Sequence, residues 1–115
     1  MIEIKEKLFT TYYFVIASNK FLLIEEPVEE VLRERVQHYQ RVKKPIDFWL
    51  VQVPSFLGSF DMKNLQARLP RNCSAIISTD KSFITWLKLR FNNVAIGNFI
   101  SPTNDIPSPL SSKLT

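Results

Sequence analysis

The chain has 115 residues, of which 45% are hydrophobic and 23% charged, the size and composition of one globular domain. One cysteine, one histidine and two glycines exclude a disulfide framework, cysteine-based metal clusters, most Ser/His or Cys/His nucleophile systems and glycine-rich phosphate loops. The net charge of +4 is uneven, because acids exceed bases by three in residues 1–34 and bases exceed acids by seven in residues 35–115; this asymmetry suits either an acidic partner or membrane surface, or simply a solubilising surface.

The first third of the chain predicts a strand followed by a helix. Residues 1–9 are expected to be a short charged leader. Thr10–Ser18 is aromatic and β-branched with apolar residues on both faces, which favours a central strand. Asn19–Ile24 is interpreted as a connection. Residues 27–44 predict a helix, because apolar side chains recur at helical spacing, acids gather at its start and bases at its end, and Pro45 is expected to stop it.

The rest of the chain predicts three more strands and two more helices. Ile46–Val53 is a second strand whose alternation places Phe48 on one face and Asp47 and Trp49 on the other. The remaining expected elements are a mixed insertion at 54–72 with a helix at Asp61–Leu69 capped by Asp61, a strand at Cys73–Thr79, a helix at Asp80–Phe91 capped by Thr79 or Asp80, a strand at Val94–Ile100, and a Pro/Ser-rich irregular tail at 101–115.

This order of elements predicts an α+β fold. Apart from the insertion between strands 2 and 3, it is the ferredoxin-like arrangement, a four-stranded antiparallel sheet covered on one face by helices. Residues 10–100 would form the single domain. The third strand lacks the aromatic residues with which RNA-recognition domains of this fold stack bases, so no nucleic-acid partner is expected. No apolar stretch approaches the roughly 20 residues of a membrane-spanning helix.

The residues most often used in catalysis have structural interpretations here. His38 lies one helical turn after Glu34, which favours an exposed Glu–His pair over a catalytic base. This spacing also differs from the Glu-x-x-His motif of di-iron bundles, and a Glu29–Arg33 pair accounts for the helix acids, so no metal site is expected. Cys73 opens a strand and is expected to be a buried packing residue rather than a thiol activated by Arg71.

Asp47 is unusual because an acid interrupts an aromatic, β-branched strand. One interpretation is an exposed recognition acid beside the aromatic anchors Phe48 and Trp49. The other is an acid at the strand edge that meets a lysine or a cap. Regular alternation would place Asp47 and Phe48 on opposite faces, so both can be surface anchors only if the strand bends or ends there.

The helix at Asp80–Phe91 carries more apolar surface than one core stripe needs. Trp86 and Leu89 fall outside the stripe, and Arg90 lies one turn from Trp86. Trp, Leu and Arg side by side suggest a protein–protein interface. Alternatively, the insertion and tail bury this helix on a second side, or Arg90 makes only a cation–π contact with Trp86. The core stripe itself is Phe83, Ile84, Leu87 and Phe91.

Several segments together resemble one known family. TYYFVIAS, EEPVEEVLRERV, PIDFWLV, AIIST and FITWLKLR are similar to the small accessory subunit of the magnesium-protoporphyrin IX monomethyl ester oxidative cyclase. This family occurs in cyanobacteria and plastids, and its plant form is called the low chlorophyll accumulation protein. The resemblance runs from about Thr10 to Pro109 and is weakest over Ser55–Arg71.

The resemblance implies a non-catalytic role in chlorophyll synthesis. The cyclase uses oxygen to close the isocyclic ring and form protochlorophyllide, and a separate membrane-associated di-iron subunit performs this chemistry. The small subunit supports that subunit's accumulation, assembly or activity, without a metal or cofactor of its own. It would lie in a cyanobacterial cytoplasm or plastid stroma and touch the thylakoid only through its partner. The expected docking residues are Asp47, Phe48, Trp49, Trp86, Leu89 and Arg90.

Two other functions stay open. The chain could deliver the tetrapyrrole, holding it on an aromatic face with an arginine near its propionate. It could also be a general assembly factor for several pigment-biosynthesis enzymes.

Overall fold

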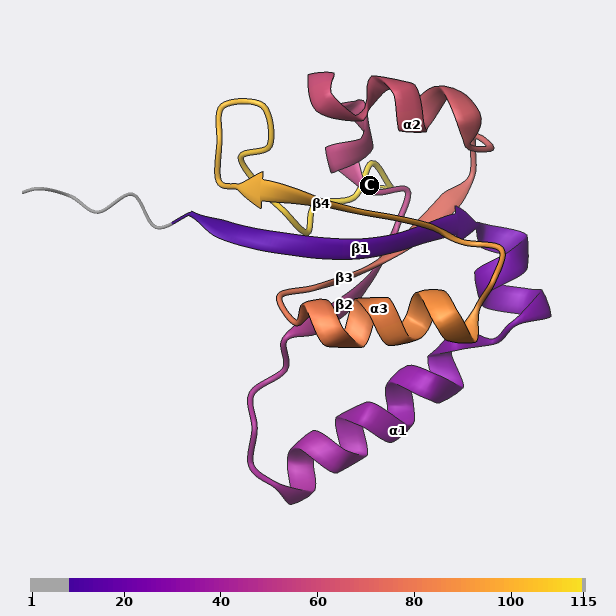
Figure 1. Cartoon of the computed structure of the whole chain (residues 1–115), viewed down its shortest axis with the longest axis vertical. Helices are drawn as coiled ribbons and strands as arrows, with labels where there is room; N and C mark the ends of the chain where they lie inside the picture. The colour runs from indigo at the N-terminus through magenta and orange to yellow at the C-terminus, as the bar shows by residue number, and fades with distance from the viewer. Residues whose placement is uncertain (1–8, 115) are drawn as a thin grey trace, which may run out of the picture.

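The structure, a computed structural model, describes residues 9–114, so the expected leader lies outside the described residues apart from Phe9. Four strands form one antiparallel sheet in the order β2-β3-β1-β4 (Figure 1). This is the ferredoxin-like order, and it confirms the predicted α+β fold. The strands are β1 (Thr10–Ser18), β2 (Phe48–Gln52), β3 (Cys73–Ser78) and β4 (Ala95–Ser101).

Two helices cover one face of the sheet. Figure 1 shows α3 (Lys81–Arg90) against the strands and α1 (Val28–Arg41) farther out on the same side. Between them and the sheet lies a core to which β1 contributes Val15 and Ala17 and α3 contributes Ile84 and Leu87. The predicted core stripe of α3 is buried throughout.

The opposite face of the sheet is also covered, which differs from the predicted one-sided packing. The insertion folds over it as two 3-10 turns, η2 (Ser55–Gly58) and η3 (Phe60–Met62), and the helix α2 (Lys63–Arg68). Phe56 from this layer lies between Phe14 of β1 and Phe99 of β4, with ring centroids 4.7 Å and 4.6 Å apart. A central strand that is apolar on both faces requires this second layer.

The helix boundaries show one correct and one incorrect capping prediction. The Asp80 carboxylate accepts hydrogen bonds from the backbone N–H groups of Ser82 and Phe83, so it is the N-cap of α3. Asp61 does not cap α2, because it lies within the preceding 3-10 turn and the helix begins at Lys63 without a side-chain cap. The expected connection at Asn19–Ile24 overlaps a short π-helix, η1 (Lys20–Glu25).

The helix α1 ends at Arg41, before the end at residue 44 that Pro45 predicts. Lys43 adopts a positive φ of 55°, while the Lys43 N–H donates to the Gln40 carbonyl and the Lys44 N–H donates to the Tyr39 carbonyl. This is a Schellman motif, which satisfies the last carbonyls of the helix and reverses the chain. The reversal brings Lys44 back beside Tyr39.

The tail is irregular, as predicted, but it packs on the domain. Ile106 is 5% exposed and joins the core of the second layer. Ser112 forms an isolated bridge with Pro54, and the Lys113 N–H donates to the Val53 carbonyl. The tail therefore covers one end of the β2 edge.

Candidate functional site

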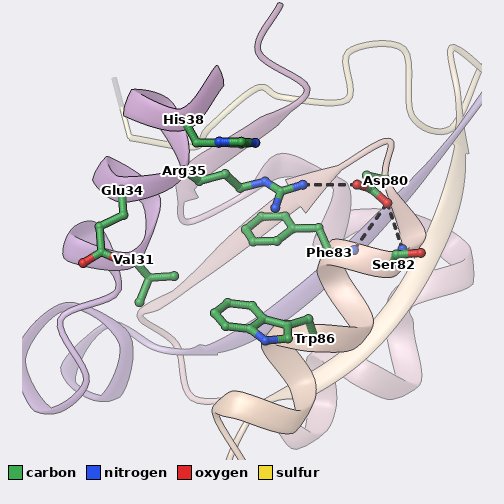
Figure 2. Close-up of a pocket in the computed structure, with 8 residues that line it drawn as sticks. All are labelled: Val31, Glu34, Arg35, His38, Asp80, Ser82, Phe83 and Trp86. Carbon is green, nitrogen blue, oxygen red and sulfur yellow. Dashed lines mark hydrogen bonds and ion pairs between the residues drawn. The ribbon is translucent and has the colours of Figure 1, made fainter. Parts of the chain in front are cut away.

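A groove of about 460 Å³ separates α1 from α3 (Figure 2). Its α1 wall comes from side chains spaced three and four residues apart, which share one helix face. Its α3 wall comes from the first turns of that helix. The lining residues are Val31, Glu34, Arg35, His38, Asp80, Ser82, Phe83 and Trp86.

Arg35 joins the two helices across this groove. Its guanidinium lies 3.7 Å from the centroid of the Phe83 ring and forms an ion pair with Asp80 at 3.1 Å. It also donates a hydrogen bond to the Tyr39 hydroxyl at 2.8 Å. Because Asp80 also caps α3, Arg35 attaches α1 to the first turn of that helix.

The Arg35 side chain is only 25% exposed, so these contacts are partly shielded from water and screened less than at the surface. The Arg35 Nε is buried and has no hydrogen-bond partner among residues 9–114. The guanidinium is therefore fixed by stacking and by its terminal nitrogens.

An aromatic stack extends from Arg35 to the surface. The Phe83 and Trp86 rings are stacked, with centroids 6.2 Å apart and planes 17° apart. Phe83 is buried, whereas Trp86 is 48% exposed. Figure 2 shows Arg35, Phe83 and Trp86 in succession along the groove. The exposed indole of Trp86 is therefore held by its stacking on the buried Phe83 ring.

Leu89 and Arg90 extend this exposed region along α3. Leu89 is 75% exposed, and the Arg90 guanidinium lies 5.1 Å from the Phe91 ring centroid. Within residues 9–114 the insertion covers the other face of the sheet, so it does not bury α3 on a second side. The Arg90 guanidinium lies over Phe91 rather than over Trp86. We call Trp86, Leu89 and Arg90 the α3 surface.

The Asp47 side chain is tied to its neighbours rather than projecting freely from the surface. Its carboxylate accepts a hydrogen bond from the Tyr39 hydroxyl at 2.9 Å and forms an ion pair with Lys44 at 3.5 Å. Its carbonyl accepts hydrogen bonds from Ser78 Oγ and the Thr79 N–H. These contacts match the interpretation of an acid at the strand edge that meets a lysine.

The hydroxyl of Tyr39 is the centre of this network. It accepts hydrogen bonds from Arg35 and from Lys44 at 3.3 Å, and it donates to Asp47. The pKa of Lys44 is raised above its ordinary value, chiefly by the hydrogen bond to Tyr39. Desolvation, the next largest effect, opposes this rise, and the charge of Asp47 adds to it. The loop after α1 is thereby tied to the start of β2.

Phe48 does not lie at the surface, which corrects its expected role as an exposed anchor. It is 4% exposed and makes edge-to-face contacts with Tyr39 and Phe83, at centroid distances of 5.3 Å and 5.4 Å. Because β2 begins at Phe48, Asp47 lies before the strand and is released from its alternation. Phe48 therefore forms part of the packing beneath Arg35.

Trp49 lies on the other side of the sheet. It is partly buried against the core of the insertion layer, because successive side chains of a strand point to opposite faces. The expected docking residues are thus divided: Trp86, Leu89 and Arg90 share one surface, Asp47 and Phe48 lie under the groove beside it, and Trp49 is remote from it.

The other candidate residues have mainly structural surroundings. His38 and Glu34 both line the groove, but no ion pair joins them in the described part of the chain. Arg33 pairs with Glu30 at 3.1 Å rather than with Glu29 as expected. Within residues 9–114 no group of three or more His, Cys, Asp or Glu side chains is placed to hold a metal ion.

Cys73 is buried, as predicted, and its thiol donates to the Pro70 carbonyl. Burial raises the pKa of this thiol above its ordinary value.

Sequence reasoning missed Arg35, the central residue of the site. One signal was present: Arg35 falls between Leu32 and Tyr39, on the apolar stripe of the helix. A cation at such a position requires a partner from another element, but only the tertiary structure identifies Asp80 as that partner.

Comparison with known proteins identifies the family. The model of the Ycf54 protein family matches residues 10–101. A Ycf54-like protein from Synechocystis is 48% identical over 111 residues, covering 96% of this chain and 84% of that protein. An uncharacterized ycf54 protein from Pyropia yezoensis is 53% identical over 90 residues, covering 78% of this chain and 81% of that protein.

A solved structure shares the fold over most of the chain. The crystal structure of the All0216 protein from Nostoc has a TM-score of 0.90 at 51% sequence identity, covering 92% of this chain and 98% of that one. In the described part of the chain, no helix combines the length and apolar character needed to cross a membrane. By sequence and by fold, the chain belongs to the Ycf54 family.

Proposed function

We propose that this protein is a non-catalytic accessory subunit of the magnesium-protoporphyrin IX monomethyl ester oxidative cyclase and that it docks on the di-iron catalytic subunit. Its membership of the Ycf54 family and the resemblance of its segments to the small cyclase subunit support this role. The carrying structural observation is the half-exposed Trp86, which an ion pair and an aromatic stack hold in place.

The α3 surface has the composition of an interface centre. Trp and Arg are enriched among residues that dominate binding energy, and Trp86 and Arg90 lie one helical turn apart. Trp86 loses little side-chain freedom on binding if its base is already ordered, which lowers the cost of association. The indole would be the apolar anchor, and Arg90 would set the register through a charge pair with an acidic group of the partner.

Asp47 and Phe48 would contribute indirectly in this proposal. They hold Tyr39 and Arg35, and Arg35 supports Phe83 and Trp86. We expect changes at Asp47 to weaken docking by loosening α1, whereas changes at Trp86 remove a contact.

The test is affinity capture of a tagged copy from cells that make chlorophyll. We expect wild type to capture the di-iron subunit and Trp86→Ala to capture about tenfold less, the size of effect typical of an interface hot spot. The matched control is Phe60→Ala, since Phe60 is also an exposed aromatic (72%) but belongs to the insertion layer. Circular dichroism would verify that each variant is folded.

The outcomes distinguish the docking site from the subunit assignment. Equal capture by wild type and Trp86→Ala would exclude the α3 surface as the anchor. Failure of the wild type to capture the di-iron subunit would contradict the assignment itself. Capture of many unrelated pigment enzymes at similar yield would favour a general assembly factor.

Tetrapyrrole delivery is tested separately by absorption. A stoichiometric shift of the Soret band of magnesium-protoporphyrin monomethyl ester on mixing with purified protein would favour direct pigment binding. An unchanged band would leave docking as the function.

The proposed location is the cyanobacterial cytoplasm or the plastid stroma. It is supported by relatives from a cyanobacterium and a red alga. Contact with the thylakoid would follow from binding to the membrane-associated partner.

A further inference from the structure

The strand β4 has an open outer edge. The sheet order places it at one margin, next to β1 alone, and within residues 9–114 no strand pairs with its other side (Figure 1). The opposite margin differs, because the tail reaches the end of β2 through Ser112 and Lys113. An edge strand presents unpaired backbone N–H and C=O groups to any chain that can align with it.

This edge lacks the features that usually prevent such pairing. The sequence of β4, AIGNFIS, contains neither a charged residue nor a proline. Its register with β1 is continuous from Ala95 to Ser101, without a bulge. Ile96 and Ile100 are 46% and 51% exposed. An uncharged edge strand of seven residues with exposed isoleucines is typical of a strand that associates.

The pattern of β4 is self-complementary. Side chains alternate, so Ile96, Asn98 and Ile100 share the face that carries the helices. If two copies pair antiparallel about Asn98, Ile96 of each lies opposite Ile100 of the other, and the two Asn98 amides lie opposite each other. Apolar then meets apolar and amide meets amide, as a two-fold interface requires.

The other face of the strand also fits this register. Gly97 would lie opposite Phe99 of the second copy. A Cβ at Gly97 would come within 2.6 Å of the Phe14 ring, so packing within the chain keeps this position free of a side chain. The position opposite Phe99 would therefore carry no side chain.

We infer that two copies of this chain associate through β4, pairing antiparallel about Asn98 to continue the sheet across the dimer. This inference is independent of the proposed cyclase role, because the α3 surface lies on a different element.

Sedimentation velocity of the full chain over a range of concentrations tests it. We expect the wild type to approach twice the 13.4 kDa mass of a single chain as concentration rises. Ile100→Lys should shift the protein to the single-chain mass, because each lysine would place a charged group against the apolar Ile96 of the other copy. Val42→Lys is the matched control, since Val42 is also exposed (55%) but follows α1; it should leave the mass unchanged.

Disulfide trapping tests the register without disturbing the core. Cα atoms opposite each other in an antiparallel pair lie about 4.5–5.5 Å apart, within reach of a disulfide. Mild oxidation of Asn98→Cys should give a covalent dimer, whereas Val42→Cys should not. A wild type that stays at the single-chain mass throughout would overturn the inference and leave the edge to an extended segment of another protein. A dimer that persists in Ile100→Lys and is not trapped by Asn98→Cys would equally overturn it.

Discussion

At the scale of single residues, one hydroxyl connects three charged groups. Tyr39 is 3% exposed, yet its oxygen reaches Arg35, Lys44 and Asp47. Buried polar groups are costly unless they are hydrogen-bonded, so such a network fixes its members in one arrangement. Through this network the carboxylate of Asp47 joins the end of α1 to the start of β2.

Tyr39→Phe removes this hydroxyl and keeps the ring. We expect the free energy of unfolding to fall by about 1–3 kcal/mol, since Asp47 and Arg35 each lose a partner. The pKa of Lys44 should move back towards its ordinary value, because its main raising influence is gone. Denaturant unfolding and NMR titration of the lysine amines measure the two effects. Tyr12→Phe, at a ring that stacks on Phe99 outside the network, should change neither.

At the scale of elements, Asp80 has two tasks. It caps the N-terminus of α3 and forms the ion pair with Arg35 that holds α1. The cap is local and is visible in the sequence, since an acid at the start of a helical pattern is a common signal. The ion pair is not local, because its partner lies 45 residues earlier in the chain.

Two substitutions separate these tasks. Asp80→Asn keeps a capping oxygen and removes the charge, so it should cost less than about 1 kcal/mol of stability, as expected for a partly exposed ion pair. Asp80→Ala also removes the cap and should cost about 1–2 kcal/mol more. Asp61→Ala is the control, because Asp61 caps no helix, and it should stay within about 0.5 kcal/mol of wild type. Chemical denaturation measures all three, and equal losses for Asp80→Asn and Asp80→Ala would contradict the capping role.

At the scale of the whole molecule, each face of the sheet carries a packed layer. The helices cover one face, and the insertion and tail cover the other, where Ile106 joins Phe56 and Phe99 in one core. The second layer therefore depends on a residue outside the 10–100 range expected for the domain. Removing apolar volume from the tail should destabilise the domain as a core substitution does.

Ile106→Ala should lower the free energy of unfolding by about 2–4 kcal/mol, because it leaves a cavity in a buried cluster. Leu114→Ala, at an apolar tail residue that is 55% exposed, should have little effect. Thermal unfolding compares the two variants. Equal stability of Ile106→Ala and wild type would show that the tail contributes no core.

Prediction from the sequence succeeded where the signal was local. The aromatic, β-branched run of β1, the apolar stripe of α1 and the Asp80 cap each depend on residues within a few positions of one another. Prediction failed at Asp61 and in the Lys20–Glu25 segment, where contacts with other elements override weak local preferences. The same limit explains why Phe48 was expected at the surface: its burial depends on Tyr39 and Phe83, which belong to two other elements.

The sequence by itself determined the order of strands and helices, and with it the ferredoxin-like sheet, because hydrophobic periodicity and caps are properties of consecutive residues. Only the tertiary structure decided which candidate residues share a surface. Trp49 packs on the face of the sheet opposite to Trp86. Asp47 and Phe48 contact Tyr39, and Arg35 pairs with Asp80. Such pairings depend on how whole elements pack, since residues far apart in the chain meet only when the elements that carry them lie against each other.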